Sequence, residues 1–334
     1  MPAYSIQFRR GTAADHSAFT GELAEITIDI TNNRVILHDG ETAGGIPLAK
    51  VSDLPIDVGD LTDVNGHIAA AISELAGSDI STATYDNVSY STWLDSSPQD
   101  IEFSPDGTKM FVVGSENEQI YQYSLTTGFD LSTVVSSPVY GSSISQAEFP
   151  LVVKFNTDGT KMYVGGGSSD NIHQYTLNTG FDINGGGITY DNVTVSPPGS
   201  MVSGIAFNTD GTKMFVTTYF DGIFQYSLST GFDISTATYD NVNIAPESGW
   251  LRNIVFNDDG TKLYSIHFSV ASGTSIRQYS LSTGFDLNTF SSDFSSFEAT
   301  EDSMSGMAFN TDFTKMYLIA AGSDDIYQYS IDVA

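Results

Sequence analysis

Histidine, cysteine and adjacent acids are the residue types whose spacing most directly indicates catalysis or metal binding. The sequence has no cysteine, which excludes disulfides, thiolate catalysis and cysteine metal sites. No two histidines stand four residues apart or in a His-x-His pair, as a histidine metal site on one element would need. We therefore expect no catalytic residues, no metal and no cofactor. The five histidines are His16, His38, His67, His173 and His267.

The acidic residues favour solubility over catalysis. Adjacent carboxylates such as Asp258 and Asp259, or Asp324 and Asp325, stand in turn-like stretches, where solvated charge is the simplest interpretation. The formal net charge of −29 over 334 residues repels phosphate backbones, so we expect no nucleic-acid partner. No stretch approaches 18 apolar residues, and the start "MPAYSIQFRR" lacks a signal-peptide core, so membrane insertion and a signal peptide are not expected.

A glutamine recurs once in each repeat, and together the five copies could form a ring of ligands. It stands in the motif I-x-Q-Y at Gln122, Gln174, Gln225, Gln278 and Gln328. A residue that every repeat keeps serves every repeat, whereas a substrate site needs asymmetry. We therefore interpret these glutamines as structural, each satisfying backbone groups of a neighbouring segment.

The elements that carry these residues repeat along the chain. Turns of the type F-N-T-D-G-T-K-M begin at Phe103, Phe155, Phe207, Phe256 and Phe309, 49 to 53 residues apart, and an I-x-Q-Y segment follows each. A period near 50 with several strands in each unit is typical of a β-propeller. Each unit reads as strand a, an Asp-Gly hairpin, strand b, strand c with I-x-Q-Y, and strand d with T-Y-D-N-V.

The ten residues "DISTATYDNV" occur at 79–88 and again, unchanged, at 233–242. Strands a, b and c occur five times, but the last unit ends without a strand d. We predict five blades, the fifth built from residues 82–90 and strands near 305–331, because a strand from the front of the chain closes the open edges of the ring. In the fifth turn Phe313 replaces glycine, which predicts a reshaped turn with Phe313 covering apolar surface.

The two faces of this propeller differ in sequence. The a–b and c–d turns barely change and form a repeating face, whereas the d–a and b–c loops differ from blade to blade and form a variable face. Aromatic planes stack on sugars and carboxylates accept hydroxyl donors, so the variable face suits a glycan. A different interpretation remains open for Trp93 and Trp250, which could fill gaps between blades. The candidate ligand-binding residues are Trp93, Glu148, Tyr219, Phe220, Asp221, Trp250, Arg252 and His267.

Residues 1–50 have another character. "AYSIQFRR", "AEITIDIT" and "RVILHD" read as strands, the last two joined by a turn at Asn32 and Asn33. The stretch "IQFRRGTAADHSAFTGELAEITIDITNNRVILHDG", above all residues 7–40, resembles the N-terminal module of bacteriophage tail fibres and related virion appendages. The resemblance implies a virion protein, a homotrimer, and contact with other virion proteins through residues 1–78. It also implies a structural role for His38 in its H-D-G turn.

The fold class that follows is mainly β: an N-terminal β module (1–50), a linker with a short helix (51–78) and a five-bladed propeller (79–334). In the linker, Val64, Ile68, Ile72 and Leu75 form one apolar stripe at helical spacing. About three turns are too few for an isolated helix in water. The helix therefore either packs on its own chain or bundles with two further copies, and both alternatives stay open.

Three functions fit this organisation. The first is a phage virion structural protein, a tail fibre or fibre-like appendage, that displays the propeller for binding a host-surface glycan, a host protein or another partner. The second is a hydrolase, either a depolymerase or a lactonase-like enzyme, because the "SPDGTK" turns loosely resemble those of lactonase-like and YVTN-type propellers. Such a resemblance implies fold far more than activity. The third is a capsid or tail decoration protein without a receptor.

Overall fold

The computed structural model describes most of the propeller and parts of the N-terminal region. The described residues are 8–11, 19–20, 26–29, 34–37, 43, 46–50, 79–92, 95–140, 144, 146–168, 170–184, 187–244, 249–269, 273–299 and 303–332. The chain divides into two compact units, residues 1–71 and 72–334, so the division falls inside the expected linker. The helical stripe Val64, Ile68, Ile72 and Leu75 lies outside the described residues.

The N-terminal unit contains one four-stranded sheet with the order β1-β2-β3-β4. β1 runs parallel to β2, whereas β2–β3 and β3–β4 are antiparallel. The β2–β3 pair confirms the two strands expected on either side of Asn32 and Asn33. The strands are β1 (Phe8–Gly11), β2 (Ile26–Asp29), β3 (Arg34–Leu37) and β4 (Ile46–Lys50).

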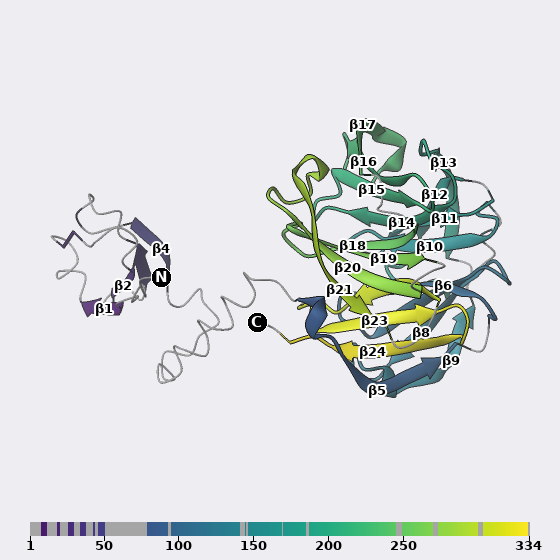
Figure 1. The fold of residues 1–334 in the computed structure, drawn as a ribbon, viewed down its shortest axis with the longest axis horizontal. Helices are drawn as coiled ribbons and strands as arrows, with labels where there is room; N and C mark the ends of the chain where they lie inside the picture. The colour runs from purple at the N-terminus through teal and green to yellow at the C-terminus, as the bar shows by residue number, and fades with distance from the viewer. Residues whose placement is uncertain are drawn as a thin grey trace. The chain divides into compact units, whose positions relative to one another are not determined.

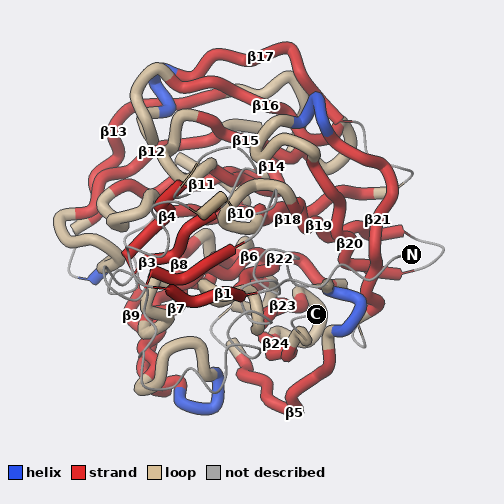
Figure 2. The backbone as a smooth tube through the Cα atoms, turned by 90° about the vertical axis from the view of Figure 1, so that its left-hand side faces the viewer, coloured by secondary structure: helices blue, strands red, loops and turns tan. Residues whose placement is uncertain are grey.

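The propeller consists of five four-stranded antiparallel sheets, and Figure 2 shows them arranged around a common centre. Their innermost strands, β6, β10, β14, β18 and β22, contact one another in that order and close the ring. Blade 1 holds β6 (Pro98–Phe103), β7 (Lys109–Gly114), β8 (Gln119–Leu125) and β9 (Val134–Tyr140); blade 2 holds β10 (Pro150–Phe155), β11 (Lys161–Gly166), β12 (Ile172–Leu177) and β13 (Ile188–Val195). Blade 3 holds β14 (Val202–Phe207), β15 (Lys213–Thr218), β16 (Gly222–Leu228) and β17 (Ala237–Ile244); blade 4 holds β18 (Trp250–Phe256), β19 (Lys262–Ser269), β20 (Gly273–Leu281) and β21 (Phe290–Glu298). Blade 5 holds β22 (Met304–Phe309), β23 (Lys315–Ala320), β24 (Asp325–Ser330) and β5 (Thr84–Ser91).

The fifth blade confirms the predicted closure. β5, from the front of the propeller region, pairs antiparallel with β24 at its end, as Figure 1 shows. Asp86 of β5 accepts hydrogen bonds from Lys315 Nζ (2.6 Å) and Gln328 Nε2 (2.8 Å). In blade 3, Asp240 of the second "DISTATYDNV" copy accepts the same bond from Gln225 Nε2 (2.9 Å). The two identical segments therefore form the same outer strand in two blades.

The apolar core is divided into five clusters, each lying between two neighbouring blades. The b strands are buried on both faces because a blade covers each side, whereas the d strands alternate between half-buried and exposed residues. The cluster between blades 4 and 5 includes Ile80, which packs with Tyr264 and Tyr329. Residues before β5 thus complete an inter-blade core as well as a sheet.

The Asp-Gly turns of blades 1 to 4 need glycine for two reasons. Gly107 has φ +67, the left-handed region that favours glycine, and a Cβ on it would lie 2.3 Å from the Phe129 ring. The Phe of each T-G-F-D motif, in the c–d turn, covers the glycine of its own blade in this way at Phe129, Phe181, Phe232 and Phe285.

The expectation of a reshaped fifth turn is wrong. Phe313 adopts φ +57, and its N–H donates to the Asn310 carbonyl oxygen at 3.2 Å, as the glycine N–H groups do in the other turns. Blade 5 has no T-G-F-D turn, because its strand d comes from the front of the chain. The Phe313 ring fills the vacant place and stacks on Phe309 (centroids 4.9 Å apart) and Tyr264 (5.7 Å), so the expected cover of apolar surface is confirmed.

The repeated glutamines join each blade to the next, which confirms their structural interpretation. Each side-chain oxygen accepts a hydrogen bond of 2.9–3.1 Å from a backbone N–H in the following blade's c–d turn. Gln278 makes this bond to Ile80, across the ring closure. In the part of the chain that the structure describes, no helix has the length and apolar character needed to cross a membrane.

Candidate functional site: the variable face

Blade 4 extends beyond its neighbours on the variable face. β19 has eight residues, whereas β15 and β23 have six each. The extension pairs Trp250, the first residue of β18, with Phe268 near the end of β19. Trp250 therefore lies inside a strand and not before it, and its ring stacks on Phe268 with centroids 5.2 Å apart.

The turn between β15 and β16 in blade 3 adds two more rings. The ring centroid of Tyr219 lies 6.1 Å from that of Trp250. The ring centroid of Phe220 lies 6.3 Å from that of Trp250, in an edge-to-face arrangement. We call Tyr219, Phe220, Trp250 and Phe268 the aromatic cluster. Phe220 is 55% exposed and Trp250 is 37% exposed, which is unusual for large apolar side chains that contact one another.

The Arg252 guanidinium contacts two rings of the aromatic cluster. Its guanidinium carbon lies 5.6 Å from the Tyr219 ring centre and 5.3 Å from that of Phe268, within the range of cation–π attraction. Its Nη1 donates to the Met304 carbonyl oxygen of blade 5 at 2.8 Å. One side chain thus links blades 3, 4 and 5 beneath the exposed rings.

Backbone hydrogen bonds fix the positions of these residues. The Tyr219 N–H donates to the Met201 carbonyl (3.2 Å), and the Leu251 N–H donates to the Tyr219 carbonyl (3.1 Å). Asp221, in the same turn, accepts from the Ser200 N–H at 3.1 Å through Oδ2 and is exposed. The cluster therefore stands on paired strands and braced turns, which hold a binding surface in place better than a free loop does.

Two other predicted candidates, His267 and Glu148, are not part of the aromatic cluster. His267 is buried on the opposite side of β19 from Phe268, and its Nε2 lies 2.8 Å from Ser265 Oγ and 3.2 Å from the Tyr279 hydroxyl. Burial and, to a smaller extent, the nearby Arg277 cation lower its pKa to about 3, so His267 is neutral and acts in packing. Glu148 is exposed in the loop before β10 of blade 2. Trp93 lies outside the described residues.

Two aromatic residues of this face were not among the sequence candidates. Phe268 belongs to the longest b–c segment, "HFSVASGTS", and its alternation with His267 was the available signal that the strand continued. Phe149, in the loop before β10, is 47% exposed and has φ +57. No repeat pattern in the sequence predicts its exposure, because the sequence of the loop before β10 does not recur in the other blades.

The centre of the ring is closed by a polar contact across it. Asn253 of blade 4 donates from Nδ2 to Asp100 Oδ1 of blade 1, and the Val153 N–H of blade 2 donates to Asp100 Oδ2 at 3.1 Å. Gly306 permits this approach, since a Cβ there would lie 2.5 Å from the Asp100 Cα. Among the described residues, no group of three or more histidine, aspartate or glutamate side chains is placed to hold a metal ion.

The N-terminal region matches known proteins. Residues 6–42 match the family model of the major tropism determinant N-terminal domain. Over 46 residues the chain is 56% identical to the tail fiber receptor-binding protein of Bordetella phage BPP-1; this covers 14% of the present chain and 12% of that protein. The expected resemblance to a phage tail-fibre N-terminal module, and with it the virion location, is confirmed by these matches.

The propeller is similar to several solved structures at low identity. Hydrazine synthase of Kuenenia stuttgartiensis has 14% identity and a TM-score of 0.44, covering 70% of this chain and 58% of that one. A protein described as a 6-phosphogluconolactonase of Bacteroides uniformis has 16% identity and a TM-score of 0.40, covering 66% and 63%. The five-bladed fold rests on the strand pairings given above and not on these similarities.

Proposed function

We propose that this chain, which carries a phage tail-fibre N-terminal domain at residues 6–42, is a fibre-like virion structural protein that displays its propeller for binding. In this proposal residues 1–78 attach to other virion proteins and form the homotrimer. The propeller offers its variable face to the host surface. The whole-protein role is a proposal because the matched segment is 12% of the tail fiber relative.

The entry point of the chain supports this orientation of the propeller. The 3-10 turn at Ile80–Thr82 occupies the same c–d position as Leu131–Thr133, Ile234–Thr236 and Leu287–Thr289. At the other end, the Ile331 N–H donates to the Thr314 carbonyl of an a–b turn (2.8 Å). The propeller region therefore starts and ends on the repeating face, and the variable face is directed away from the point where the linker enters.

The observation that carries the proposed binding role is the exposed aromatic cluster. Contiguous exposed apolar patches often mark surfaces that bind a partner or a ligand. Here the rings are presented by the blade that extends furthest and are held by Arg252. Aromatic planes stack on the C–H faces of sugars, and the exposed Asp221 accepts hydroxyl donors, so a host-surface glycan is the ligand class that we propose.

The test is to remove exposed rings and compare binding with stability. Trp250→Ala and Phe220→Ala should each weaken binding of the full chain to bacterial surface polysaccharides on an array by about tenfold, equal to about 1.4 kcal/mol. Phe294→Ala is the matched control: this residue is 40% exposed but lies on the outer strand β21. Its binding should be unchanged.

Thermal or urea unfolding of the same variants separates a site from a core. We expect the free energy of unfolding to change little for Phe220→Ala, because more than half of that side chain is exposed. A loss of about 3 kcal/mol or more for Trp250→Ala, typical of a core aromatic, would show that the ring serves packing. Equal loss of binding in Phe294→Ala would show that the effect does not belong to the variable face.

A further inference from the structure

The repeating face contains a cavity near the ring centre that the proposed function does not use. Its volume is about 190 Å³, and four of the five innermost strands contribute to its walls, through Glu102, Lys154, Val255 and Ala308. We call it the axial pocket. Pro105, Asp258 and Thr311, one from each of three a–b turns, are exposed at its rim. The pocket therefore opens on the face opposite to the aromatic cluster.

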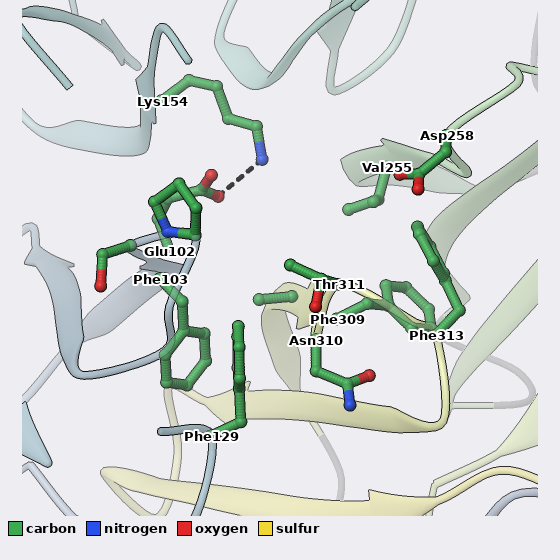
Figure 3. Close-up of a pocket in the computed structure, with 13 residues that line it drawn as sticks. Glu102, Phe103, Phe129, Lys154, Val255, Asp258, Phe309, Asn310, Thr311 and Phe313 are labelled. Atoms are coloured by element: carbon green, nitrogen blue, oxygen red, sulfur yellow. Dashed lines mark hydrogen bonds and ion pairs between the residues drawn. The ribbon is translucent and has the colours of Figure 1, made fainter. Parts of the chain in front are cut away.

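The pocket exists because one repeated position carries different residues. Glu102, Lys154, Ala206, Val255 and Ala308 are equivalent, each standing directly before the phenylalanine that ends strand a. Three copies are short and apolar, which leaves space, and two are charged. Figure 3 shows Glu102 and Lys154 on one side of the pocket and Asp258, Val255 and Phe313 on the other.

The two charged copies form an ion pair that the fold does not require. Lys154 Nζ lies 2.6 Å from Glu102 Oε2, and the two side chains are only 20% and 18% exposed. Desolvation makes such a pair no more stabilising than well-packed apolar residues. The other three blades have apolar residues at this position, so the propeller is compatible with them. The ion pair therefore points to recognition of a ligand.

Several polar groups around the pocket keep unused hydrogen-bonding capacity. Among the described residues, Lys154 Nζ donates one hydrogen bond although it carries three N–H groups, and Glu102 Oε1 accepts none. The Asp258 carboxylate and the Thr311 hydroxyl likewise have no hydrogen-bond partner among the residues that the structure describes. Donors and acceptors thus face the same space above an apolar floor of Val255, Ala308 and Phe309.

We propose that the axial pocket binds a single neutral sugar ring. A ring with several hydroxyl groups both donates to Glu102 and Asp258 and accepts from Lys154, while its C–H face covers the apolar floor. An anionic ligand is repelled by Asp258 and by the net charge of −29. A cationic amine is repelled by Lys154. The volume is below the roughly 300–1,000 Å³ of drug-sized ligand pockets, so it suits one ring and not a chain.

Saturation-transfer NMR on the full chain tests this proposal, with glucose, galactose, mannose and N-acetylglucosamine as neutral probes. Glucosamine and glucuronate serve as the cationic and anionic probes. We expect saturable binding of at least one neutral sugar and weaker binding of both charged ones. No saturable neutral sugar, or tighter binding of a charged probe, would overturn the proposal.

Paired variants locate the binding. Glu102→Gln with Lys154→Met removes both charges at nearly constant volume, and Asp258→Thr installs the residue that blades 2, 3 and 5 carry at this position. Each should weaken sugar binding by about tenfold with an unchanged melting temperature. The matched control is Thr209→Asp, at the equivalent place in blade 3, which should bind as the parent does. Binding that survives the double variant refutes the site.

A second control keeps this inference independent of the proposed function. Trp250→Ala lies on the other face, so it should leave binding of the neutral sugar unchanged. If Trp250→Ala abolishes that binding, the sugar occupies the aromatic cluster and the axial pocket is not its site. If only the axial-pocket variants abolish it, the sugar binds in the axial pocket. That conclusion does not depend on what the polysaccharide array shows for the variable face.

Discussion

At the scale of single residues, Phe313 shows how one substitution compensates for a break in the repeat. In blades 1 to 4 the turn glycine leaves room for the phenylalanine of the c–d turn. Blade 5 takes its strand d from the front of the chain and lacks that phenylalanine. Phe313 supplies the missing ring from the a–b turn itself and accepts a backbone φ of +57 to do so.

Replacing Phe313 by Gly should therefore destabilise the protein, although it restores the glycine of the other four turns. Loss of a half-buried ring costs about 1–3 kcal/mol after allowance for its partial exposure. Relief of the left-handed backbone strain stabilises the variant by about 1 kcal/mol. Urea unfolding measures the difference. Phe285→Ala, which removes the corresponding ring of blade 4, is the matched comparison. A Phe313→Gly variant more stable than the parent would refute this account.

Asp100 predicts a dependence of stability on pH. Burial raises its pKa to about 8, against roughly 3.9 in an unfolded chain. The folded protein thus keeps a proton that the unfolded chain has already lost. The stability contributed by the neutral carboxyl is complete below about pH 4 and is lost as the pH rises toward 8.

Asp100→Asn should flatten this dependence. The amide oxygen still accepts from the Val153 N–H, and the amide nitrogen donates to Asn253 once that side chain turns its oxygen inward. Urea unfolding at several pH values between 5 and 8 should show the parent losing more stability than the variant. Parallel curves would indicate that Asp100 is ionised throughout and that its two hydrogen bonds outweigh burial.

At the scale of elements, β5 does three things that hold the ring together. It pairs with β24, and its Asp86 carboxylate accepts hydrogen bonds from Lys315 and Gln328. In the turn before β5, the Ile80 N–H donates to the Gln278 side-chain oxygen. Removing residues 79–90 leaves β24 as an open edge and leaves these polar groups without their partners.

We therefore expect the deletion of residues 79–90 to abolish the cooperative melt and to cause aggregation. Calorimetry and light scattering of the full chain measure both effects. A deletion of the same length within residues 51–63, outside the closing strand, is the control and should melt like the parent. A normal melt after the loss of residues 79–90 would contradict closure by β5.

Features that depend on periodicity could be predicted from the sequence, whereas features that depend on the filling of space could not. The spacing of the Asp-Gly turns and the second "DISTATYDNV" copy were enough for the blade number and the closing strand. The conformation at Phe313 was not predictable, because it depends on an empty place left by a residue of another turn. Similarly, Tyr219, Phe220, Trp250 and Arg252 were grouped by their loops, but Phe268 joins them only because blade 4 extends further.

At the scale of the whole molecule, the propeller completes its five sheets within one chain, so it needs no second copy to close its ring. The N-terminal region is the part whose relative is a tail fiber protein. The linker carries the apolar stripe of Val64, Ile68, Ile72 and Leu75, which is too short for a stable isolated helix. Three copies side by side would bury this stripe, as in a short coiled coil.

We accordingly predict that the full chain is a trimer in multi-angle light scattering at micromolar concentration. Aspartate at both Ile68 and Ile72 places charge in the stripe and should yield monomers, since burying unpaired carboxylates opposes association. The propeller should keep its own melting transition in these monomers, because its cores lie between blades of one chain. Aspartate at the exposed positions Thr209 and Thr311 of the propeller is the control and should leave the trimer intact. A parent protein that is monomeric would exclude assembly through residues 1–78, whereas a trimer that persists with both aspartates would place the contacts outside the linker stripe.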